Sequence, residues 1–378
     1  MFMEMAEVEE LLCQIDSSCY GGFYYDDNDA ININILKNQA FDWGIDNPNV
    51  VYHTVKYSLQ ALMSYKNALS DALLGYHGIH MIYLSICENI INIGVDNDSD
   101  IILSAIRDDI SKVYVPVDAY KIQKRHRFTN LVYTPKNPIV FDNSRILTEE
   151  TYDYRHKIMA GGWLGFGSSS SSTTTLSHFS SVTCGFSYNN MYGIMTCGHG
   201  KTNGLYAFWG APPPSSGTYP QSLSSYDPDW IVYFGKIVLV NYSTYPTYKY
   251  DFSSIKKLTN TTIMAGTAYS GHTIAGTTGT PAEGKVGYFT GAANKKVRSK
   301  VLSISADFEE DMRGNKMRDL FIVNKPGNLG TSGGPFYYKP TGSNSFKVAG
   351  MACTTDSSET AFAKISHVKS LYNFTPIF

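Results

Sequence analysis

The chain has 378 residues, a formal net charge of -2 and charged side chains at only 17% of its positions. This balance lacks the basic excess that marks nucleic-acid-binding proteins, so we expect no nucleic-acid partner. The length exceeds that of one typical domain and predicts two or three. Tyrosine (28), phenylalanine (19) and glycine (32) are abundant, which favours β-rich structure over a helical bundle.

Three features bear on where the chain resides and what it binds. The longest apolar run, residues 79–95, is interrupted by Glu88, Asn89 and Asn92, so we expect no membrane span. The first residues, MFMEMAEVEE, are acidic and lack the basic and apolar regions of a secretory signal. The six cysteines fall three in each half, which predicts no complete disulfide framework, and no pair has the spacing of a zinc finger.

The N-terminal part predicts a small α+β domain. Residues 51–75 repeat apolar positions at helical spacing and predict a helix that ends near Gly75. Two short β-type runs follow at 79–86 and 89–95, and residues 98–114 begin with Asp and Ser, as a helix N-cap does. The basic run KIQKRHR (121–127) is consistent with a partner-binding patch or a solvated face, and its isolation favours the solvated face.

The composition changes near residue 160. From MAGGWLGFG onward, short strand-like runs alternate with Gly, Pro, Asn and Ser turns, which predicts an all-β barrel or sandwich of about 220 residues. SSSSSTTT (168–175) predicts a flexible surface loop, and APPPSSGTYP (211–220) predicts a second one. Helical periodicity returns only in the last residues of the chain.

The stretch GNLGTSGGPFYY (327–338) places Ser332 between glycines, just before a strand-like run. Glycines permit a tight turn and leave the space around the hydroxyl open. One interpretation is a nucleophile whose neighbouring N–H groups, on Gly330 and Ser332, bind an oxyanion. The other is a plain glycine-rich turn. A partner histidine and carboxylate must decide between them.

Among the four histidines of the β-rich half, His199 has a distinctive context. In YGIMTCGHG an apolar strand ends in a turn of small residues, which presents the imidazole at the strand end. We interpret the other three, His178, His272 and His367, as structural or solvated.

The predicted carboxylate partner of His199 is Asp229, which opens a strand in YDPDWIVYF. A part-buried carboxylate at a strand mouth can hold a histidine's tautomer and stabilise its imidazolium. The alternative is Asp227, but it precedes Pro228 and fits a turn cap better. Both are also consistent with ordinary turn aspartates.

The order histidine, aspartate, serine within one β-rich segment is that of chymotrypsin-like proteases and differs from that of subtilisins and α/β-hydrolases. Residues 158–378 resemble the bacterial branch of that family, the streptogrisin and alpha-lytic protease type. The matching stretches are IMAGG (158–162), CGFSYNNMYGIMTCGHG (184–200), DWIV (229–232), GTSGGP (330–335) and VAGMACTT (348–355).

This resemblance implies an all-β, chymotrypsin-like double β-barrel with a triad in the cleft between the barrels. Such an enzyme hydrolyses peptide bonds in proteins or peptides through an acyl-enzyme and needs no metal or cofactor. Mapped onto this chain, Ser332 attacks, His199 acts as general base and then acid, and Asp229 orients it. The N–H groups of Gly330 and Ser332 then form the oxyanion hole.

The resemblance also assigns substrate binding to the strand that contains Cys353, Thr354 and Thr355, which would pair with the substrate backbone. The two threonines lie about where glycines often open a deep pocket in this family. We therefore expect small or medium apolar side chains before the cut.

The sequence departs from the family pattern at several positions. Thr331 replaces the usual aspartate before the nucleophile, so pairing of a new N-terminal ammonium with that carboxylate is not available. Gly200 replaces a cysteine and leaves Cys184 without its usual partner, for which Cys197 is a candidate substitute. Cys353 stands where a serine that supports the catalytic aspartate is expected.

Residues 88–114 resemble, more faintly, the pro-region module of the same branch. The implied organisation is an α+β pro-domain at 1–157, which assists folding and inhibits the active site, followed by the protease domain at 158–378. Self-processing of this zymogen is expected near YRHKIMAGG, at Lys157 or Ile158. The family implies secretion, in conflict with the missing signal, and a cytoplasmic location stays open.

Three alternatives remain. The first is a catalytically inactive, protease-like binding protein, against which the intact triad argues. The second is a structural β-protein in which GTSGGP is only a turn, and which a fluorophosphonate would not label. The third is an intracellular regulatory protease with the same chemistry, and a disulfide would favour the exported form over it.

Overall fold

The structure of the protein is a computed structural model that describes residues 3–37, 43–131, 139–142, 158–169, 173–210, 231–241, 251–257, 263–268, 271–292, 294–309 and 316–378. Strands form most of its regular structure, and helices are few in these ranges. No helix in the described ranges is long and apolar enough to cross a membrane. The mostly-β character predicted from composition is confirmed.

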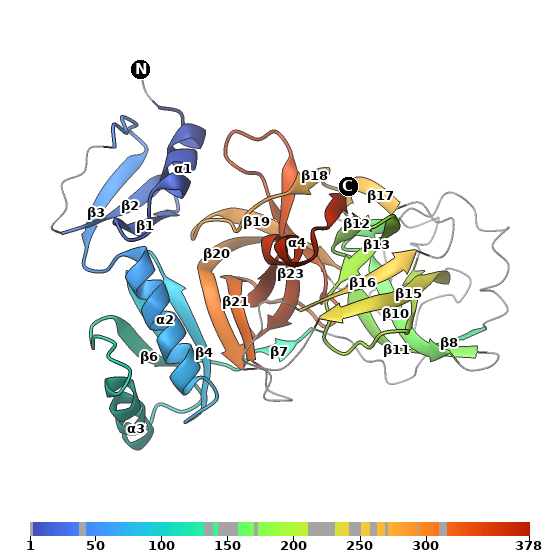
Figure 1. Ribbon diagram of the computed structural model, residues 1–378, viewed down its shortest axis with the longest axis horizontal. Helices are drawn as coiled ribbons and strands as arrows, with labels where there is room; N and C mark the ends of the chain where they lie inside the picture. The colour runs from blue at the N-terminus through green and yellow to red at the C-terminus, as the bar shows by residue number, and fades with distance from the viewer. Residues whose placement is uncertain are drawn as a thin grey trace.

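The first part of the chain is a three-stranded sheet covered by one helix (Figure 1). The helix is α1 (Met5–Gln14), and the strands are β1 (Tyr20–Tyr25), β2 (Ile31–Leu36) and β3 (Val50–Val55). The predicted helix over 51–75 is wrong in its first turns, because VVYHTV forms β3. Its valines and threonine are β-branched and fit a strand better than a helix.

The helix predicted there begins later, as α2 (Leu59–Leu73), where the side chain of Ser58 accepts a hydrogen bond from the N–H of Ala61. The strands predicted next are confirmed as the antiparallel pair β4 (Ile79–Ser85) and β5 (Ile90–Val95). The second predicted helix is α3 (Asp100–Ser111). Strand β6 (Tyr120–Lys124) then pairs in parallel with β5.

The C-terminal part contains two large sheets (Figure 1). The nine-stranded sheet has the order β25 (Thr375–Ile377), β12 (Cys184–Tyr188), β13 (Met191–Thr196), β16 (Phe252–Lys257), β15 (Ile231–Asn241), β14 (Tyr206–Gly210), β10 (Trp163–Ser169), β11 (Thr173–Ser181) and β8 (Ile139–Asp142). Its inner face buries an apolar cluster that includes Leu164, Phe166, Ile194 and Phe234. Closure of the sheets into two barrels stays a prediction.

The second large sheet crosses from one half of the chain to the other. Its order is β19 (Val286–Gly291), β22 (Pro335–Tyr338), β23 (Phe346–Thr355), β24 (Thr360–Lys364), β21 (Lys316–Val323), β20 (Asn294–Glu309), β4, β5 and β6. Strands β18 (Ile274–Thr277) and β7 (Thr129–Asn130) also pair with β23. The remaining elements are the pair β9 (Ile158–Ala160) and β17 (Ile263–Ala268), and helix α4 (Ile365–Tyr372).

Ion pairs reinforce the junction of β4 with β20. Lys66 on α2 places its Nζ 2.6 Å from Oδ1 of Asp307 on β20, and both side chains are buried. The basic run at 121–127 also contacts the other half of the chain, because Nη2 of Arg125 lies 2.6 Å from Oε1 of Glu359, which precedes β24. The favoured interpretation of this run as a solvated face is therefore wrong for Arg125, whose partner is in the other half of the chain.

Two loop predictions have different outcomes. The described ends of SSSSSTTT are paired strand residues, Ser168 with Thr175 and Ser169 with Thr174, so the predicted loop is a hairpin there. The proline-rich stretch 211–220 lies outside the described residues. All six cysteines are described and none is in a disulfide, so the suggested substitute pairing of Cys184 with Cys197 does not form.

Candidate active site

Ser332 lies in a tight turn just before β22. The turn needs glycine on both sides, because Gly330 and Gly333 have φ angles of 95° and 83°. A Cβ on Gly333 would also lie 2.2 Å from Oγ1 of Thr196 and 2.4 Å from the carbonyl oxygen of Ser181. The turn is thus packed directly against β11 and β13, and the glycine spacing seen in the sequence is a steric requirement.

His199 follows β13, as the sequence predicted. The strand ends at Thr196, and Cys197 and Gly198 carry the chain into a turn. His199 is 2% exposed and its Nε2 is within hydrogen-bonding distance of Oγ of Ser332. The structure therefore brings together two of the three predicted triad residues, His199 after a strand of the nine-stranded sheet and Ser332 before a strand of the second large sheet.

The carboxylate beside Nδ1 of His199 belongs to Asp251, a residue that the sequence analysis did not single out. Asp251 directly precedes β16, and β16 pairs with β13 so that Thr196 faces Ser253. This register places the Asp251 carboxylate against the turn after β13, where Oδ1 accepts the N–H groups of Gly198 and His199, each at 2.8 Å. Asp229, the predicted partner, and Asp227 lie outside the described residues.

The electrostatics of this buried site favour a charged histidine. Burial alone would lower the pKa of His199, but the carboxylate of Asp251 and the sulfur of Cys197 outweigh it and raise that pKa. Burial would likewise raise the pKa of Asp251, and the hydrogen bonds and charge of His199 lower it instead. An ionised Asp251 facing an imidazolium is the arrangement that a triad needs after proton transfer.

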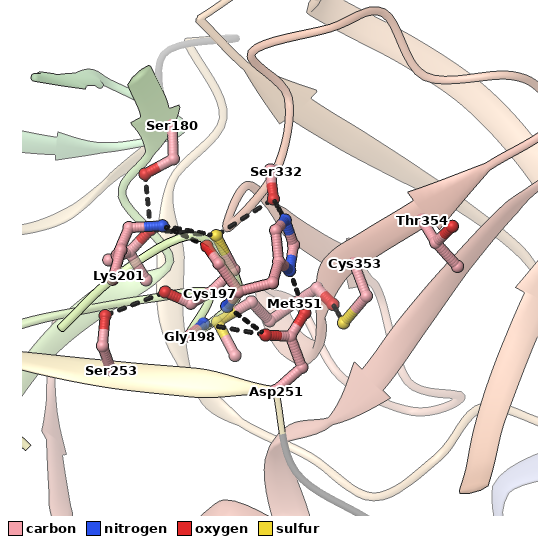
Figure 2. A network of polar contacts seen from close by, with 12 residues as sticks. Ser180, Cys197, Gly198, Lys201, Asp251, Ser253, Ser332, Met351, Cys353 and Thr354 are labelled. Atoms are coloured by element: carbon pink, nitrogen blue, oxygen red, sulfur yellow. Dashed lines mark hydrogen bonds and ion pairs between the residues drawn. The ribbon is translucent and has the colours of Figure 1, made fainter. Parts of the chain in front are cut away.

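Cys197 is an unexpected member of the site. The hydroxyl of Ser332 donates to its Sγ at 3.0 Å, and Nζ of the buried Lys201 donates to the same sulfur at 2.8 Å (Figure 2). Burial would raise the pKa of the Cys197 thiol, but the positive charges of His199 and Lys201 lower it. The sulfur therefore accepts two hydrogen bonds beside Ser332, and the neighbouring positive charges favour its thiolate form.

The strand expected to bind substrate already pairs with another part of the chain. Thr354 and Thr355 on β23 face Asn130 and Thr129 on β7 in an antiparallel ladder. The third predicted residue, Cys353, is buried, and its thiol donates to the carbonyl of Met351 at 3.2 Å. Burial and the charge of Asp251 raise the pKa of the Cys353 thiol, so it is a neutral neighbour of that carboxylate.

One of the two predicted oxyanion donors, the N–H of Gly330, also has a hydrogen-bond partner within the chain. The N–H of Gly330 donates to the carbonyl oxygen of Leu131, at 2.5 Å. The backbone around Ser332 is fixed by further contacts, since its carbonyl accepts the N–H of Ser181 at 2.6 Å.

Among the described residues, no cluster of His, Cys, Asp and Glu is arranged to hold a metal ion.

Among the comparisons with known proteins, only the search of solved structures finds similar proteins. The chain is similar to Thermobifida fusca Protease A (TM-score 0.42, 15% identity), Nocardiopsis protease (0.41, 14%) and Cellulomonas bogoriensis chymotrypsin (0.40, 15%). These matches cover 58%, 59% and 58% of this chain and 98%, 100% and 98% of theirs. No family model and no curated protein matches the sequence.

Proposed function

We propose that the chain is a serine endopeptidase. The observation that supports this proposal is the continuous chain of contacts from Oγ of Ser332 to Nε2 of His199 and from Nδ1 of His199 to Asp251. A serine hydroxyl is a weak nucleophile until an adjacent base takes its proton, and the base needs a third group to orient it. Asp251 takes the orienting role that the sequence analysis assigned to Asp229.

In the proposed reaction, Oγ of Ser332 attacks the carbonyl carbon of a peptide bond and its proton passes to Nε2 of His199. The oxyanion accepts hydrogen bonds from the N–H groups of Gly330 and Ser332, which are often the largest single contribution to such a rate. The amine leaves with the proton from His199, and water then hydrolyses the acyl-enzyme. Side chains and water complete this sequence, so we propose no cofactor.

The experiment that tests this function is covalent labelling followed by intact mass. We expect a fluorophosphonate to add to the full-length protein at Ser332 and to leave Ser332→Ala unmodified. Asp251→Asn should lower kcat by about ten-thousandfold, because the histidine loses its tautomer. The matched variant Asp229→Asn separates the two candidate carboxylates and should retain activity. Absence of any label would instead support an inactive, protease-like binding protein.

We further propose that the N-terminal half is a pro-domain that inhibits and helps to fold the catalytic half. The continuous sheet from β20 to β4 and the buried pair of Lys66 and Asp307 support this, because both hold the two halves together. Substrates would be proteins or peptides that bind along β23. Secretion stays a prediction of the family resemblance.

A further inference from the structure

The segment that follows the basic run, residues 128–131, lies along the strand expected to bind substrate. Besides the ladder between β7 and β23, the hydroxyl of Thr354 donates to the carbonyl of Thr129 at 2.7 Å. The side chain of Thr129 donates to the carbonyl of Thr355 at 3.4 Å. An extended peptide added antiparallel to an exposed strand is how many proteins bind peptides.

Leu131 ends this segment at the catalytic turn. Its carbonyl oxygen accepts the N–H of Gly330, two residues before the nucleophile. A carbonyl in this position is polarised by the same donor that would stabilise the oxyanion formed from it. The backbone of residues 129–131 thus places a peptide carbonyl on one of the two N–H groups proposed for the oxyanion hole, two residues from Ser332.

The side chain of Leu131 is fully buried in an apolar pocket. It belongs to a cluster with aromatic and aliphatic residues of the second large sheet, among them Phe289, Phe321, Phe336 and Phe362. Gly327 forms a wall of this pocket, because a Cβ added there would lie 3.3 Å from both Cδ atoms of Leu131. The pocket therefore fits a leucine side chain closely and contains no charge among these neighbours.

We propose that residues 128–131 occupy the cleft as a substrate, that the bond between Leu131 and Val132 is the one the chain cuts in itself, and that the enzyme cleaves after leucine. This inference rests on the proposed function and assigns its substrate class. In the cut, the ester between Ser332 and the Leu131 carbonyl forms as the bond to the nitrogen of Val132 breaks. His199 delivers the proton to that nitrogen, and water then frees a Leu131 carboxylate.

This cut divides the chain differently from the processing expected at Lys157 or Ile158. Strand β8 (Ile139–Asp142) pairs along β11 of the nine-stranded sheet, with Thr174 facing Phe141. A cut after Leu131 leaves β8 with the sheet it belongs to. A cut at residue 157 or 158 would leave that strand attached to the N-terminal half.

The first test is the mass and N-terminal sequence of the full-length protein after incubation at neutral and alkaline pH, with fluorophosphonate labelling in parallel. We expect a new N-terminus at Val132 in the wild type and none in Ser332→Ala. Leu131→Asp should abolish that cut and speed labelling at least tenfold, because a charge does not remain in the apolar pocket. The matched control is Ile101→Asp, at a position that is 84% exposed, and it should behave as wild type.

The second test makes the pocket smaller and then makes the side chain that occupies it smaller. Gly327→Val should block the cut after Leu131 and change the preference among Phe-Thr-Asn-X p-nitroanilides from X = Leu to X = Ala by at least tenfold. Adding Leu131→Ala to Gly327→Val should restore the self-cut. Gly279→Val is the control for the glycine substitution, because a Cβ there meets no atom within 4 Å.

The outcomes separate this inference from the proposed function. A label on Ser332, with self-cutting only elsewhere or with no preference for leucine over arginine or glutamate, overturns the inference and leaves the serine peptidase intact. No label in the wild type or in Leu131→Asp overturns both. Three results together support both: a label on Ser332, a cut after Leu131, and a change of preference from leucine to alanine in Gly327→Val.

Discussion

Two of the contacts between the N-terminal half and the C-terminal half differ in chemistry. At the docking contact, where β4 extends β20, charged groups such as Lys66, Asp307 and Glu283 are buried at the junction. At the cleft contact, residues 128–131 are held by two ladder pairs, two threonine hydrogen bonds and the donated N–H of Gly330. The side chains of Phe128 and Leu131 are both buried there. The first contact buries charged groups, whereas the second consists of backbone hydrogen bonds and apolar side chains, which are the contacts that a substrate peptide would make under the proposed function.

The largest effect should come from breaking the docking contact at its buried ion pair. Lys66→Met leaves the Asp307 carboxylate without its cation in the interior, and removal of one partner of such a pair costs about 3–5 kcal/mol. The measurement is denaturant unfolding in the Ser332→Ala background, which prevents self-cutting. The control is Lys56→Met, whose exposed pair with Asp118 at 2.5 Å should leave unfolding nearly unchanged. Equal effects of both variants would contradict the comparison.

A second effect concerns the pH dependence of the same contact. Glu283 accepts hydrogen bonds from the N–H groups of Ile86 and Cys87, yet burial raises its pKa to about 7. A carboxyl whose pKa is higher in the folded state than in the unfolded state stabilises the fold fully below the unfolded value of 4.5, and this contribution is lost as the pH rises through about 7.

Stability in the Ser332→Ala background should therefore fall from pH 6 to pH 8.5 by an amount of order 1 kcal/mol. The measurement is the unfolding free energy across this range, and Glu283→Gln, which cannot ionise, should flatten the slope whatever its effect at one pH. A slope unchanged by the substitution would show that other groups titrate instead.

A third prediction moves to the catalytic site, where the cleft contact ends. Cys197→Ala removes the anionic sulfur that, with Asp251, raises the pKa of His199. The base form of His199 is present only above its pKa, so the acid limb of the kcat/KM profile should move to lower pH in this variant. Each unit of movement raises activity below the limb about tenfold. A profile identical to that of wild type would exclude a role for the sulfur in setting the charge of His199.

The smallest effect should come from trimming the cleft contact itself. Thr354→Val keeps the shape of the side chain and removes the hydrogen bond from its hydroxyl to the Thr129 carbonyl. Loss of such a bond costs about 1 kcal/mol, so fluorophosphonate labelling of the full-length protein should become about fivefold faster. Unfolding of the same variant should change far less than that of Lys66→Met, which is the contrast between the two contacts.

Short sequence patterns identified those parts of the site that depend only on neighbouring residues, namely the turns at Ser332 and His199. Ser332 and His199 both lie in turns of small residues beside apolar strands, and a short stretch of sequence is enough to specify such a turn. The strand pair 79–95 and the helix after it were predicted for the same reason, because alternation and capping are read over a few residues.

The partner of His199 could not be found in this way. Asp229 in PDWIVYF opens an apolar run, whereas the run after Asp251 in KYDFSSIKK mixes Phe and Ile with Ser and Lys, so the local context favoured Asp229. The pairing of β16 with β13 sets Asp251 beside Gly198 and His199. His199 and Asp251 are 52 residues apart, and the register between their two strands cannot be derived from either strand alone. Cys197 and Lys201 each lie two residues from His199 in the sequence, but only the fold shows that Lys201 donates to the Cys197 sulfur and that this sulfur accepts a hydrogen bond from Ser332.

The sequence by itself determined the β-rich class of the catalytic half, the nucleophile turn and the histidine turn, because glycine spacing and apolar alternation act within a few residues. Only the tertiary structure decided that Asp251 completes the contacts of His199, that β4 continues the sheet of the other half, and that the carbonyl of Leu131 accepts the N–H of Gly330. Each of these depends on contacts between residues far apart in the chain, and the free energy of such contacts is set by the packing and pairing of the whole fold.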